Sequence, residues 1–281
     1  MTDVSSTAGK EWKVVSIVGV GLIGGSFALA LREAGFDGKI IGVNPPETLP
    51  EALERKVIDQ ALPLEEAAAQ SDFIYLAQPI AAILKTLDVI DGFVPKGTLI
   101  SDAGSTKQAI VTRARERIHR GRFIGGHPMA GKEARGVAAA EATLFRNRAY
   151  VLTEPDPELE KWIVRIGARV VILGPAEHDR VVALVSHLPQ LISTALASSL
   201  ATEPAAECVG GPAAIDLTRL ALSPYEIWRD IFATNAGPID DALALFISRL
   251  EQLRRTLRGP ELEREFDRAA DAARNLRRQN P

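Results

Sequence analysis

The sequence predicts an α/β fold with a doubly wound parallel sheet, followed by an all-α helical domain. Short apolar runs alternate with helical segments as far as residue 175, which is the pattern of βαβ units. A glycine-rich turn follows the first apolar run. After Gly174-Pro175 the apolar residues take helical spacing and keep it to the end of the chain. We expect residues 1–11 to form a flexible N-terminus, residues 12–175 the α/β domain and residues 176–281 the helical domain.

Composition limits the possible partners. The chain has 281 residues, a length that favours two domains over one, and a formal net charge of -3. This charge gives no electrostatic basis for binding nucleic acid or an anionic membrane surface, so neither is an expected partner. No metal site is expected. The single Cys208 cannot form an intramolecular disulfide, which is compatible with a reducing cytosol.

The elements of the first domain follow from its apolar runs. Val14–Val18 is a short apolar strand that ends in glycines, and Gly24–Ala34 is a helix that ends at Gly35. The next expected elements are a strand at Lys39–Val43, a helix around Leu49–Lys56, a strand at Asp72–Leu76, a helix at Ile80–Ile90 and a strand at Thr98–Asp102. Two later apolar runs, Ala149–Leu152 and Arg169–Leu173, are expected to extend the same sheet.

The helical half contains a segment, Val181–Ala201, that carries no formal charge and is long enough for a membrane span. Its histidine, proline, glutamine and five hydroxyl residues favour instead a helix buried in a protein core or a subunit interface. A second apolar stripe, expected to be core or subunit contact, is formed by Leu243, Phe246, Leu250, Leu253 and Leu257. The protein is therefore expected to be soluble and cytoplasmic.

The glycine-rich turn has the sequence G-V-G-L-I-G at residues 19–24, between the first strand and the first helix. In that position the motif predicts a Rossmann-type dinucleotide site. Gly19 permits the tight turn, Gly21 lets a pyrophosphate approach the backbone, and Gly24 lets the helix pack on the strand. The phosphates would then meet unpaired N–H groups at the helix start, where Leu22 and Ile23 lie. The alternative is a glycine turn that binds nothing.

The residue at the end of the second strand should contact the adenosine ribose. An acidic residue there favours NAD, because it bonds the 2′-hydroxyl and repels a 2′-phosphate. This chain has Asn44, followed by two prolines, and no arginine follows to bind a phosphate. The choice between NAD and NADP therefore stays open, with NAD slightly favoured.

Two polar segments follow strands of the predicted sheet, at the edge where ligands bind in such folds. The first is S-D-A-G-S-T-K at residues 101–107, whose Ser105 and Lys107 are placed to meet a substrate. A plain loop with a helix-capping Ser or Thr is the alternative. The second is G-G-H-P-M-A-G at residues 125–131. His127, between glycines and a proline, is a candidate catalytic residue rather than a typical core histidine.

These motifs, in this order and spacing, resemble those of the prephenate/arogenate dehydrogenase family. The matching segments are GVGLIGGS, SDAGSTK and GGHPMAGKEARG, then VSHLP, DLTRLA, SP, WRDI and Asn235 in the helical half. The resemblance covers roughly residues 14–240. It implies a Rossmann domain joined to a helical dimerisation domain, hence a homodimer. It also implies NAD(P)-dependent oxidative decarboxylation of prephenate or arogenate, to 4-hydroxyphenylpyruvate or tyrosine, in tyrosine biosynthesis.

The resemblance also assigns roles to individual residues. His127 matches the histidine that accepts a hydrogen bond from the ring hydroxyl and takes its proton, which suits a neutral imidazole. Ser105 matches the serine beside that hydroxyl, and we expect it to contact the cofactor as well. Arg219 matches the arginine that binds a carboxylate, where a planar fork can pair with both oxygens. For His187, substrate contact and helix packing are both open.

Gln190 departs from the family pattern, because some members that use prephenate have a histidine here. Its amide can accept from an ammonium or donate to a ketone, so it fits arogenate at least as well as prephenate. Rival functions are another dehydrogenase or reductase of the β-hydroxyacid dehydrogenase or imine reductase type, and a non-catalytic dinucleotide sensor. The first leaves the histidine segment unexplained, and the second predicts loss of His127 or Arg219, which are both present. Feedback control by tyrosine stays open.

Overall fold

The computed structural model describes residues 12–279, so the expected flexible segment at residues 1–11 lies outside the described residues. The chain divides into two compact units, the first ending at His178 and the second beginning at Asp179. This division lies inside helix α7 (Pro175–Val182), which begins at the residue where the sequence places the domain boundary.

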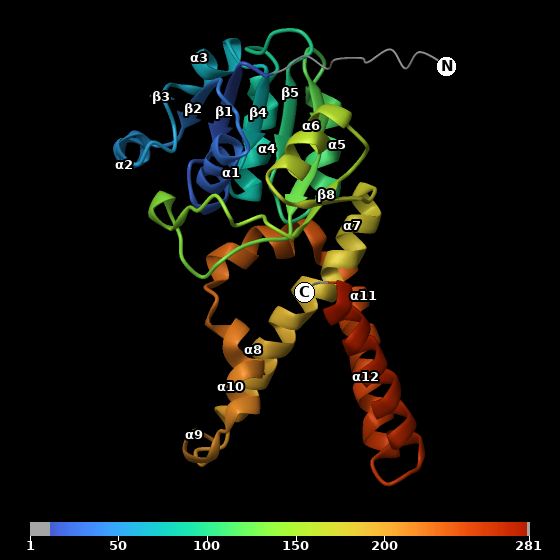
Figure 1. The fold of residues 1–281 in the computed structure, drawn as a ribbon. Helices are drawn as coiled ribbons and strands as arrows, with labels where there is room; N and C mark the ends of the chain where they lie inside the picture. Colours follow the sequence, from blue (N-terminus) through green and yellow to red (C-terminus); the bar gives the residue numbers. More distant parts are fainter. Residues whose placement is uncertain (1–11, 280–281) are drawn as a thin grey trace, which may run out of the picture. The chain divides into compact units, whose positions relative to one another are not determined.

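The first unit is built on a six-stranded parallel sheet in the order β3-β2-β1-β4-β5-β6 (Figure 1). Its strands are β1 (Val14–Val18), β2 (Lys39–Val43), β3 (Gln60–Ala61), β4 (Phe73–Leu76), β5 (Leu99–Asp102) and β6 (Arg122–Ile124). Because the chain moves outward from β1 to β3 and then returns to β4, the direction of winding reverses between β1 and β4. The predicted Rossmann-type sheet is confirmed, and the reversal is where ligands bind in this fold.

Helices cover the main sheet. They are α1 (Leu22–Glu33), α2 (Leu49–Glu54), α3 (Leu64–Ala69), α4 (Ile80–Ile90), α5 (Gln108–Arg117) and α6 (Pro157–Arg165). Every residue of β4 and β5 is buried, and successive strand residues point to opposite faces, so both faces are covered. Aromatic stacking adds to the core, since Phe27 lies 4.1 Å from Tyr75 and Trp12 lies 4.2 Å from Phe73, centroid to centroid.

Two of the predicted strands belong to a different sheet. β8 (Ala149–Leu152) and β9 (Arg169–Ile172) form a three-stranded sheet with β7 (Gly126–Pro128), in the order β7-β8-β9. The expectation that they extend the main sheet was therefore wrong. The physical reason is the break at Gly125, after which β7 pairs antiparallel with β8 and supplies the partner that the edge strand β6 would have given.

The second unit is helical, as predicted. After α7, which spans the division, come a π-helical turn (Ala183–His187), α8 (Leu188–Leu200), α9 (Ala206–Val209), α10 (Pro212–Thr218), a 3-10 turn (Arg219–Leu222), α11 (Tyr225–Thr256) and α12 (Glu261–Gln279). Helix α11 contains Pro238 and is interrupted at Asn235, whose φ of -131° is not helical. Such an interruption is expected next to proline, which removes a helix hydrogen bond and collides with the preceding turn.

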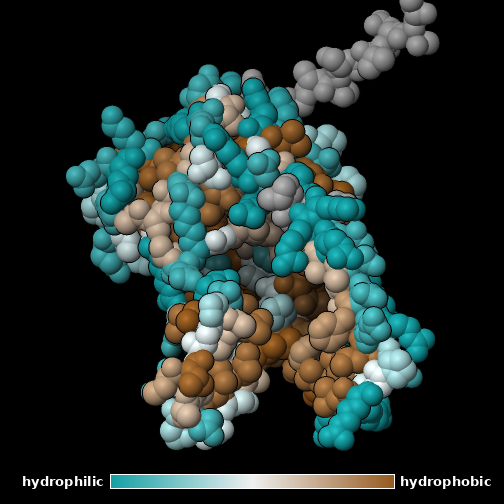
Figure 2. Space-filling view, turned by 60° about the horizontal axis from the view of Figure 1, so that its bottom comes forward, coloured by the Kyte–Doolittle hydropathy of each residue, from teal (hydrophilic) through white to brown (hydrophobic). Residues whose placement is uncertain are grey.

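Much of the apolar surface of the second unit is exposed within one chain. Figure 2 shows apolar side chains gathered on the helices of this unit. In the predicted stripe, Leu250 on α11 is 49% exposed and Leu257, directly after that helix, is 63% exposed, so this stripe is not core of the single chain. The helical run Pro175–Leu200 is long and apolar enough to cross a membrane by length and composition alone, and a third of its most apolar window is buried.

Candidate active site

The glycine turn has the geometry that each glycine was expected to provide. Gly19 has a φ of +99°, and a Cβ there would lie 2.7 Å from the backbone of Ala77, so another residue would be strained and obstructed. A Cβ on Gly24 would lie 2.1 Å from the carbonyl oxygen of Gly19, which shows how closely the helix packs on the turn. Gly21 differs, since a Cβ there would meet nothing within 4 Å. Its backbone borders open space, which a ligand can approach.

Helix α1 begins directly after this turn and has no side-chain cap. Gly21 is its N-cap residue and supplies no side-chain cap hydrogen bond, and no acidic residue lies in the first turn of this helix. Leu22 and Ile23 are half-buried there. The N–H groups of an uncapped helix start, together with the positive end of the helix dipole, form a binding site for phosphate. The residues present therefore fit the pyrophosphate of a dinucleotide.

Asn44 lies at the carboxyl end of β2, beside the glycine turn. Its side-chain Oδ1 accepts a hydrogen bond from the N–H of Val20 at 3.3 Å, and its Nδ2 donates to the hydroxyl of Thr48. The residue is half-buried, and both the oxygen and the nitrogen of its amide have protein partners. The ribose contact stays a prediction for Asn44, and in the structure its amide holds the turn against β2.

Strand β5 ends in a buried ion pair, between Asp102 and Lys107. Both side chains are fully buried. Asp102 also accepts from the N–H of Gly104 at 2.8 Å and from that of Gly126 at 3.0 Å, while Lys107 donates to the carbonyl of Gly126 at 2.7 Å. The expectation that Lys107 meets a substrate was therefore wrong. Its ammonium is buried, where it balances the carboxylate that holds the loop together.

The same ion pair fixes the chain next to the candidate histidine. Gly126 is bonded through both its N–H and its carbonyl, and His127 follows it on β7, opposite Val151 of β8. A Cβ on Gly126 would lie 2.6 Å from the backbone oxygen of Asp102, and one on Gly125 would lie 2.8 Å from Thr153. The paired glycines are therefore required for the close approach of this segment to β5 and β8.

His127 is buried and its ring contacts a second histidine. His127 Nδ1 lies 2.8 Å from Nε2 of His178, on α7, and His178 is completely buried. Ser105 lies half-buried in the loop between β5 and α5, the loop that the Asp102–Lys107 pair holds beside Gly126. The structure thus brings the Ser105 loop and the His127 strand together through Gly126.

Two tyrosines join the sheets beneath this segment. The hydroxyl of Tyr150 on β8 donates to that of Tyr75 on β4 at 3.0 Å, and both residues are fully buried. Burial raises the pKa of Tyr75 and of Tyr150 well above the usual value for a phenol. The negative charge of Asp102 adds to the rise at both residues, so both phenols stay protonated and can act as hydrogen-bond donors.

In the helical unit, His187 lies at the end of the π-helical turn and is buried. Its Nδ1 is 3.2 Å from Nδ2 of Asn235, which also donates to the carbonyl of Asp179 at 2.9 Å. The ring of Trp228 meets the His187 ring edge to face, with centroids 6.1 Å apart. Asn235 therefore joins α7 to α11, and the break in α11 at this residue places its amide against the histidine.

Gln190 is one turn further along, on α8, and is 4% exposed. Its Nε2 donates to the hydroxyl of Thr194 at 3.3 Å, and that hydroxyl donates in turn to the carbonyl of Gln190 at 2.9 Å. Because the Thr194 hydroxyl has given its proton to the carbonyl, the amide atom facing it must be the donor nitrogen. Among residues 12–279, Gln190 Oε1 has no hydrogen-bond partner although it is buried. Such an acceptor is costly unless a donor meets it.

Arg219 is exposed at the start of the 3-10 turn Arg219–Leu222. The turn is anchored to α8, because the N–H of Ala221 donates to the buried hydroxyl of Ser193 at 3.0 Å. The hydroxyl of Ser223, just after the turn, accepts from the indole N–H of Trp228 at 2.9 Å. These bonds fix the backbone that carries Arg219.

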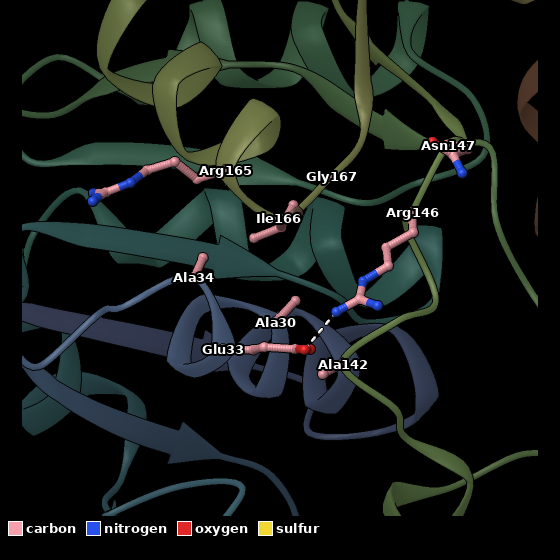
Figure 3. Close-up of a pocket in the computed structure, with 9 residues that line it drawn as sticks. All are labelled: Ala30, Glu33, Ala34, Ala142, Arg146, Asn147, Arg165, Ile166 and Gly167. Carbon is pink, nitrogen blue, oxygen red and sulfur yellow. Dashed lines mark hydrogen bonds and ion pairs between the residues drawn. The ribbon is translucent and has the colours of Figure 1, made fainter.

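A pocket of about 320 Å³ lies elsewhere on the first unit and contains none of the predicted site residues. Figure 3 shows it at the C-terminal end of α1, where Glu33 pairs with Arg146 from a loop. The dinucleotide motif is at the opposite end of that helix. In the part of the chain that the structure describes, no cluster of three or more His, Cys, Asp or Glu side chains could hold a metal ion.

Three residues of this arrangement have no role predicted from the sequence. His178 lies 51 residues from His127, and the small number of histidines in the chain is the one signal that points to it. Asp102 pairs with Lys107 and accepts from the N–H of Gly126, 24 residues away. Asn235 contacts His187 and Asp179, which are 48 and 56 residues away. For Asp102 and Asn235, the local sequence carries no indication of these contacts.

Models of one protein family match both halves of the chain. The family model described as "Prephenate dehydrogenase, nucleotide-binding domain" matches residues 27–171, and "Prephenate dehydrogenase, dimerization domain" matches residues 174–270. A prephenate dehydrogenase of Lactococcus lactis is 36% identical in an alignment of 248 positions that covers 86% of this chain and 70% of that protein.

Two solved structures are similar over nearly the whole chain. The prephenate dehydrogenase of A. aeolicus, in complex with hydroxyphenyl propionate and NAD+, has a TM-score of 0.87 at 28% identity, covering 95% of this chain and 99% of that one. The arogenate dehydrogenase of Synechocystis has a TM-score of 0.83 at 31% identity, covering 94% and 99%.

Proposed function

This chain belongs to the prephenate dehydrogenase family, and we propose how its own residues perform the family reaction. It is an oxidoreductase of tyrosine biosynthesis that catalyses the oxidative decarboxylation of prephenate, arogenate or both, with NAD or NADP. The rival assignments are not favoured, because both halves match models of this one family.

The observation that carries the proposal is the setting of His127. The imidazole is buried and fixed on β7 by its neighbours, its Nδ1 contacts His178, and we assign its other ring nitrogen, Nε2, as the base. The bound dinucleotide would supply the hydride acceptor. Gly19, Gly21 and Gly24, with the N–H groups of Leu22 and Ile23, would hold its pyrophosphate.

His127 takes the proton of the ring hydroxyl at Nε2 as the hydride leaves the carbinol carbon. The bond to the ring carboxylate then breaks, carbon dioxide leaves, and its electron pair completes the aromatic ring as a phenolate. The phenolate takes the proton back from His127, so the histidine ends as it began. Ser105 holds the hydroxyl in place and contacts the cofactor.

Carboxylate binding is assigned to Arg219. The ring carboxylate leaves as a neutral gas, so binding it would be lost in the transition state and would raise the barrier. The side-chain carboxylate stays charged throughout. We therefore assign Arg219 to the side-chain carboxylate, which a guanidinium can pair through two parallel hydrogen bonds. His187 is assigned to substrate contact through its ring, with Asn235 holding Nδ1.

Gln190 supports a preference for arogenate. Its buried Oε1 is an acceptor, and the bond between Nε2 and Thr194 prevents the amide from presenting its nitrogen instead. The ammonium of arogenate is a donor, whereas the keto oxygen of prephenate is another acceptor. Satisfying a buried acceptor with a charged donor is worth about 1.5–3 kcal/mol.

The preference can be tested by removing the acceptor. Gln190→Met should lower kcat/KM for arogenate by about tenfold or more, while kcat/KM for prephenate changes less than about threefold. Gln252→Met, at an exposed glutamine of α11, is the matched control and should change neither. Equal losses on both substrates would contradict the role of Gln190 in discrimination.

We also propose that the protein is a homodimer located in the cytoplasm. The exposed apolar helices of the second unit, which match a dimerization domain, support a homodimer in which a second chain covers them. The apolar run Pro175–Leu200 would then contribute to protein interfaces rather than a membrane span. A biosynthetic enzyme of this kind is placed in the cytoplasm.

One assay tests the proposed reaction. The purified chain is given prephenate or arogenate, each with NAD or NADP, and reduced nicotinamide is followed by absorbance together with release of carbon dioxide. Reduced nicotinamide and carbon dioxide should form in equal amounts with at least one pair of substrate and cofactor. Reduction without carbon dioxide would assign the chain to another dehydrogenase class, and no reduction with any pair would contradict the enzyme assignment.

A further inference from the structure

His178, in the first turn of α7, contacts the ring of His127 on β7. The nitrogens His178 Nε2 and His127 Nδ1 are 2.8 Å apart, and the ring centroids are 5.1 Å apart at an angle of 68°. The rings are therefore joined through their nitrogens and are not stacked. His178 is completely buried, so water does not compete for this bond. We propose that His178 is a positioning residue that sets the tautomer of His127, a role that rests on the function proposed above.

The hydrogen bond decides which nitrogen of His127 can act as a base. A neutral imidazole has one N–H and one acceptor nitrogen, so one proton lies between His127 Nδ1 and His178 Nε2. If that proton belongs to His127, its Nε2 has a lone pair and can take a proton from a hydroxyl. If it belongs to His178, then Nε2 of a neutral His127 carries hydrogen and cannot. Only the first arrangement makes a base.

The catalytic arrangement therefore requires His178 to accept through Nε2 and to carry its own proton on Nδ1. Both rings are attached to regular structure that can hold this geometry. His127 lies on β7, paired with β8, and the N–H of His178 donates to the carbonyl of Gly174 at 2.8 Å at the start of its helix. When His127 takes a second proton, its Nδ1–H bond to His178 becomes a charge-assisted bond and is strengthened. A catalytic histidine oriented through its second nitrogen is a recurring device in enzymes.

Two substitutions distinguish the contribution of the hydrogen-bond acceptor of His178 from that of the volume of its ring. His178→Leu fills similar space but offers no acceptor. His178→Gln places an amide oxygen near the position of Nε2, where it can accept from His127 Nδ1. His119→Gln is the matched control, because it removes a histidine from the exposed surface of the same unit.

The first measurement needs no substrate. The chain has four histidines, so ¹⁵N labelling of histidine alone gives a spectrum that His127→Asn and the variants above can assign. At about pH 8, where an ordinary imidazole is neutral, His127 should show a pyrrole-type Nδ1 and a pyridine-type Nε2. The pattern should persist in His178→Gln and His119→Gln, and should change toward an Nε2–H form in His178→Leu. An Nε2–H tautomer of His127 in the unaltered protein would overturn the proposal, as would an unchanged pattern in His178→Leu.

The second measurement is kinetic. His178→Leu should lower kcat by about 10- to 100-fold, the range seen when the partner that orients a metal-binding histidine is removed, with KM for the substrate nearly unchanged. His178→Gln should recover most of the loss. A purely structural role would instead lower the melting temperature in both variants without rescue by glutamine, and that result would overturn the proposal. The tautomer of His127 is measured without substrate. If the chain turned over neither prephenate nor arogenate, the proposed reaction would be contradicted, but the tautomer measurement would still test the role of His178.

Discussion

The two units of this chain bury their apolar residues very differently. The first unit closes its core within the chain, because β4 and β5 are fully buried and aromatic rings stack between α1 and the sheet. The second unit is a set of helices with much of its apolar surface exposed (Figure 2). Among residues 12–279, four of the exposed large apolar side chains belong to the first unit and fourteen to the second.

The first unit buries its apolar surface within one chain, whereas the second needs another surface to cover its helices. A doubly wound sheet covers its own two faces with helices from the same chain, so its site residues are fixed by bonds within the unit. A helix with an exposed apolar stripe needs another surface to cover it. We therefore expect substitutions in the first unit to affect chemistry and cofactor binding, and substitutions on the exposed helices of the second unit to affect assembly.

The largest expected effect is on chemistry in the first unit. His127→Asn should lower kcat by about 10²- to 10⁴-fold, the usual contribution of a general base. Dinucleotide affinity, measured by fluorescence titration, and the oligomeric state should stay as in the unaltered protein. A variant with near-normal turnover would remove His127 from the mechanism. Loss of the dimer would contradict the expectation that substitutions in the first unit leave assembly unchanged.

Assembly should depend on the second unit. Leu250→Glu with Leu257→Glu places two charges in the proposed interface, and we expect the dimer to weaken by about 100-fold or more, since a central apolar contact is worth about 2 kcal/mol. Light scattering across a concentration series measures this. The matched control is Val89→Glu with Val164→Glu in the first unit, where the exposed fractions of 51% and 61% are close to the 49% and 63% of the leucines. Equal effects of the two pairs, or an unaltered protein that is monomeric at micromolar concentration, would contradict the proposed interface.

Arg219 tests whether the second unit also contributes to substrate binding. Arg219→Ala should reduce kcat/KM by about 10- to 100-fold, mostly through KM, because a charge-assisted bond made in ground and transition states alike is lost. Lysine should restore only part, since it has the charge without the planar fork. On an analogue without the side-chain carboxylate, Arg219→Ala and the unaltered protein should be about equally poor. An equal loss on that analogue would assign Arg219 another role.

The smallest expected effect is at Asn44. Asn44→Asp can still accept from the Val20 N–H, so the turn should be preserved, while the new charge repels a 2′-phosphate. We expect the ratio of kcat/KM with NADP to that with NAD to fall by several-fold, measured by steady-state assays with each cofactor. An unchanged ratio would show that Asn44 serves the turn alone and does not meet the ribose.

The fold was predictable where local sequence decides it. The strands at Val14–Val18 and Lys39–Val43 and the helix at Ile80–Ile90 have the predicted bounds, because apolar runs and flanking glycine and proline residues are local properties. Sheet membership is not local. The runs that became β8 and β9 were predicted as strands but placed in the wrong sheet, since their partner β7 is set by a break at Gly125.

The candidate site divides in the same way. The glycine turn could be predicted in detail, because the φ of Gly19 and the lack of space beside Gly24 each require glycine at one position. Lys107 could not, because only the folded chain shows that its ammonium is buried against Asp102. His178 is separated from His127 by 51 residues, and no spacing in the sequence indicates their contact.

The π-helical turn Ala183–His187 determines where this helix tolerates a change of length. A π turn holds one residue more than an α-helical turn, and the helix continues on both sides of it. Deleting Leu184 would therefore let the turn close with ordinary α geometry, and Gln190, on α8, would keep nearly the same direction about the axis. Deleting one residue from the regular part of the helix would instead rotate every later side chain by roughly 100°. Among homologous sequences that keep Gln190, we expect one-residue gaps in this helix to fall at the π turn.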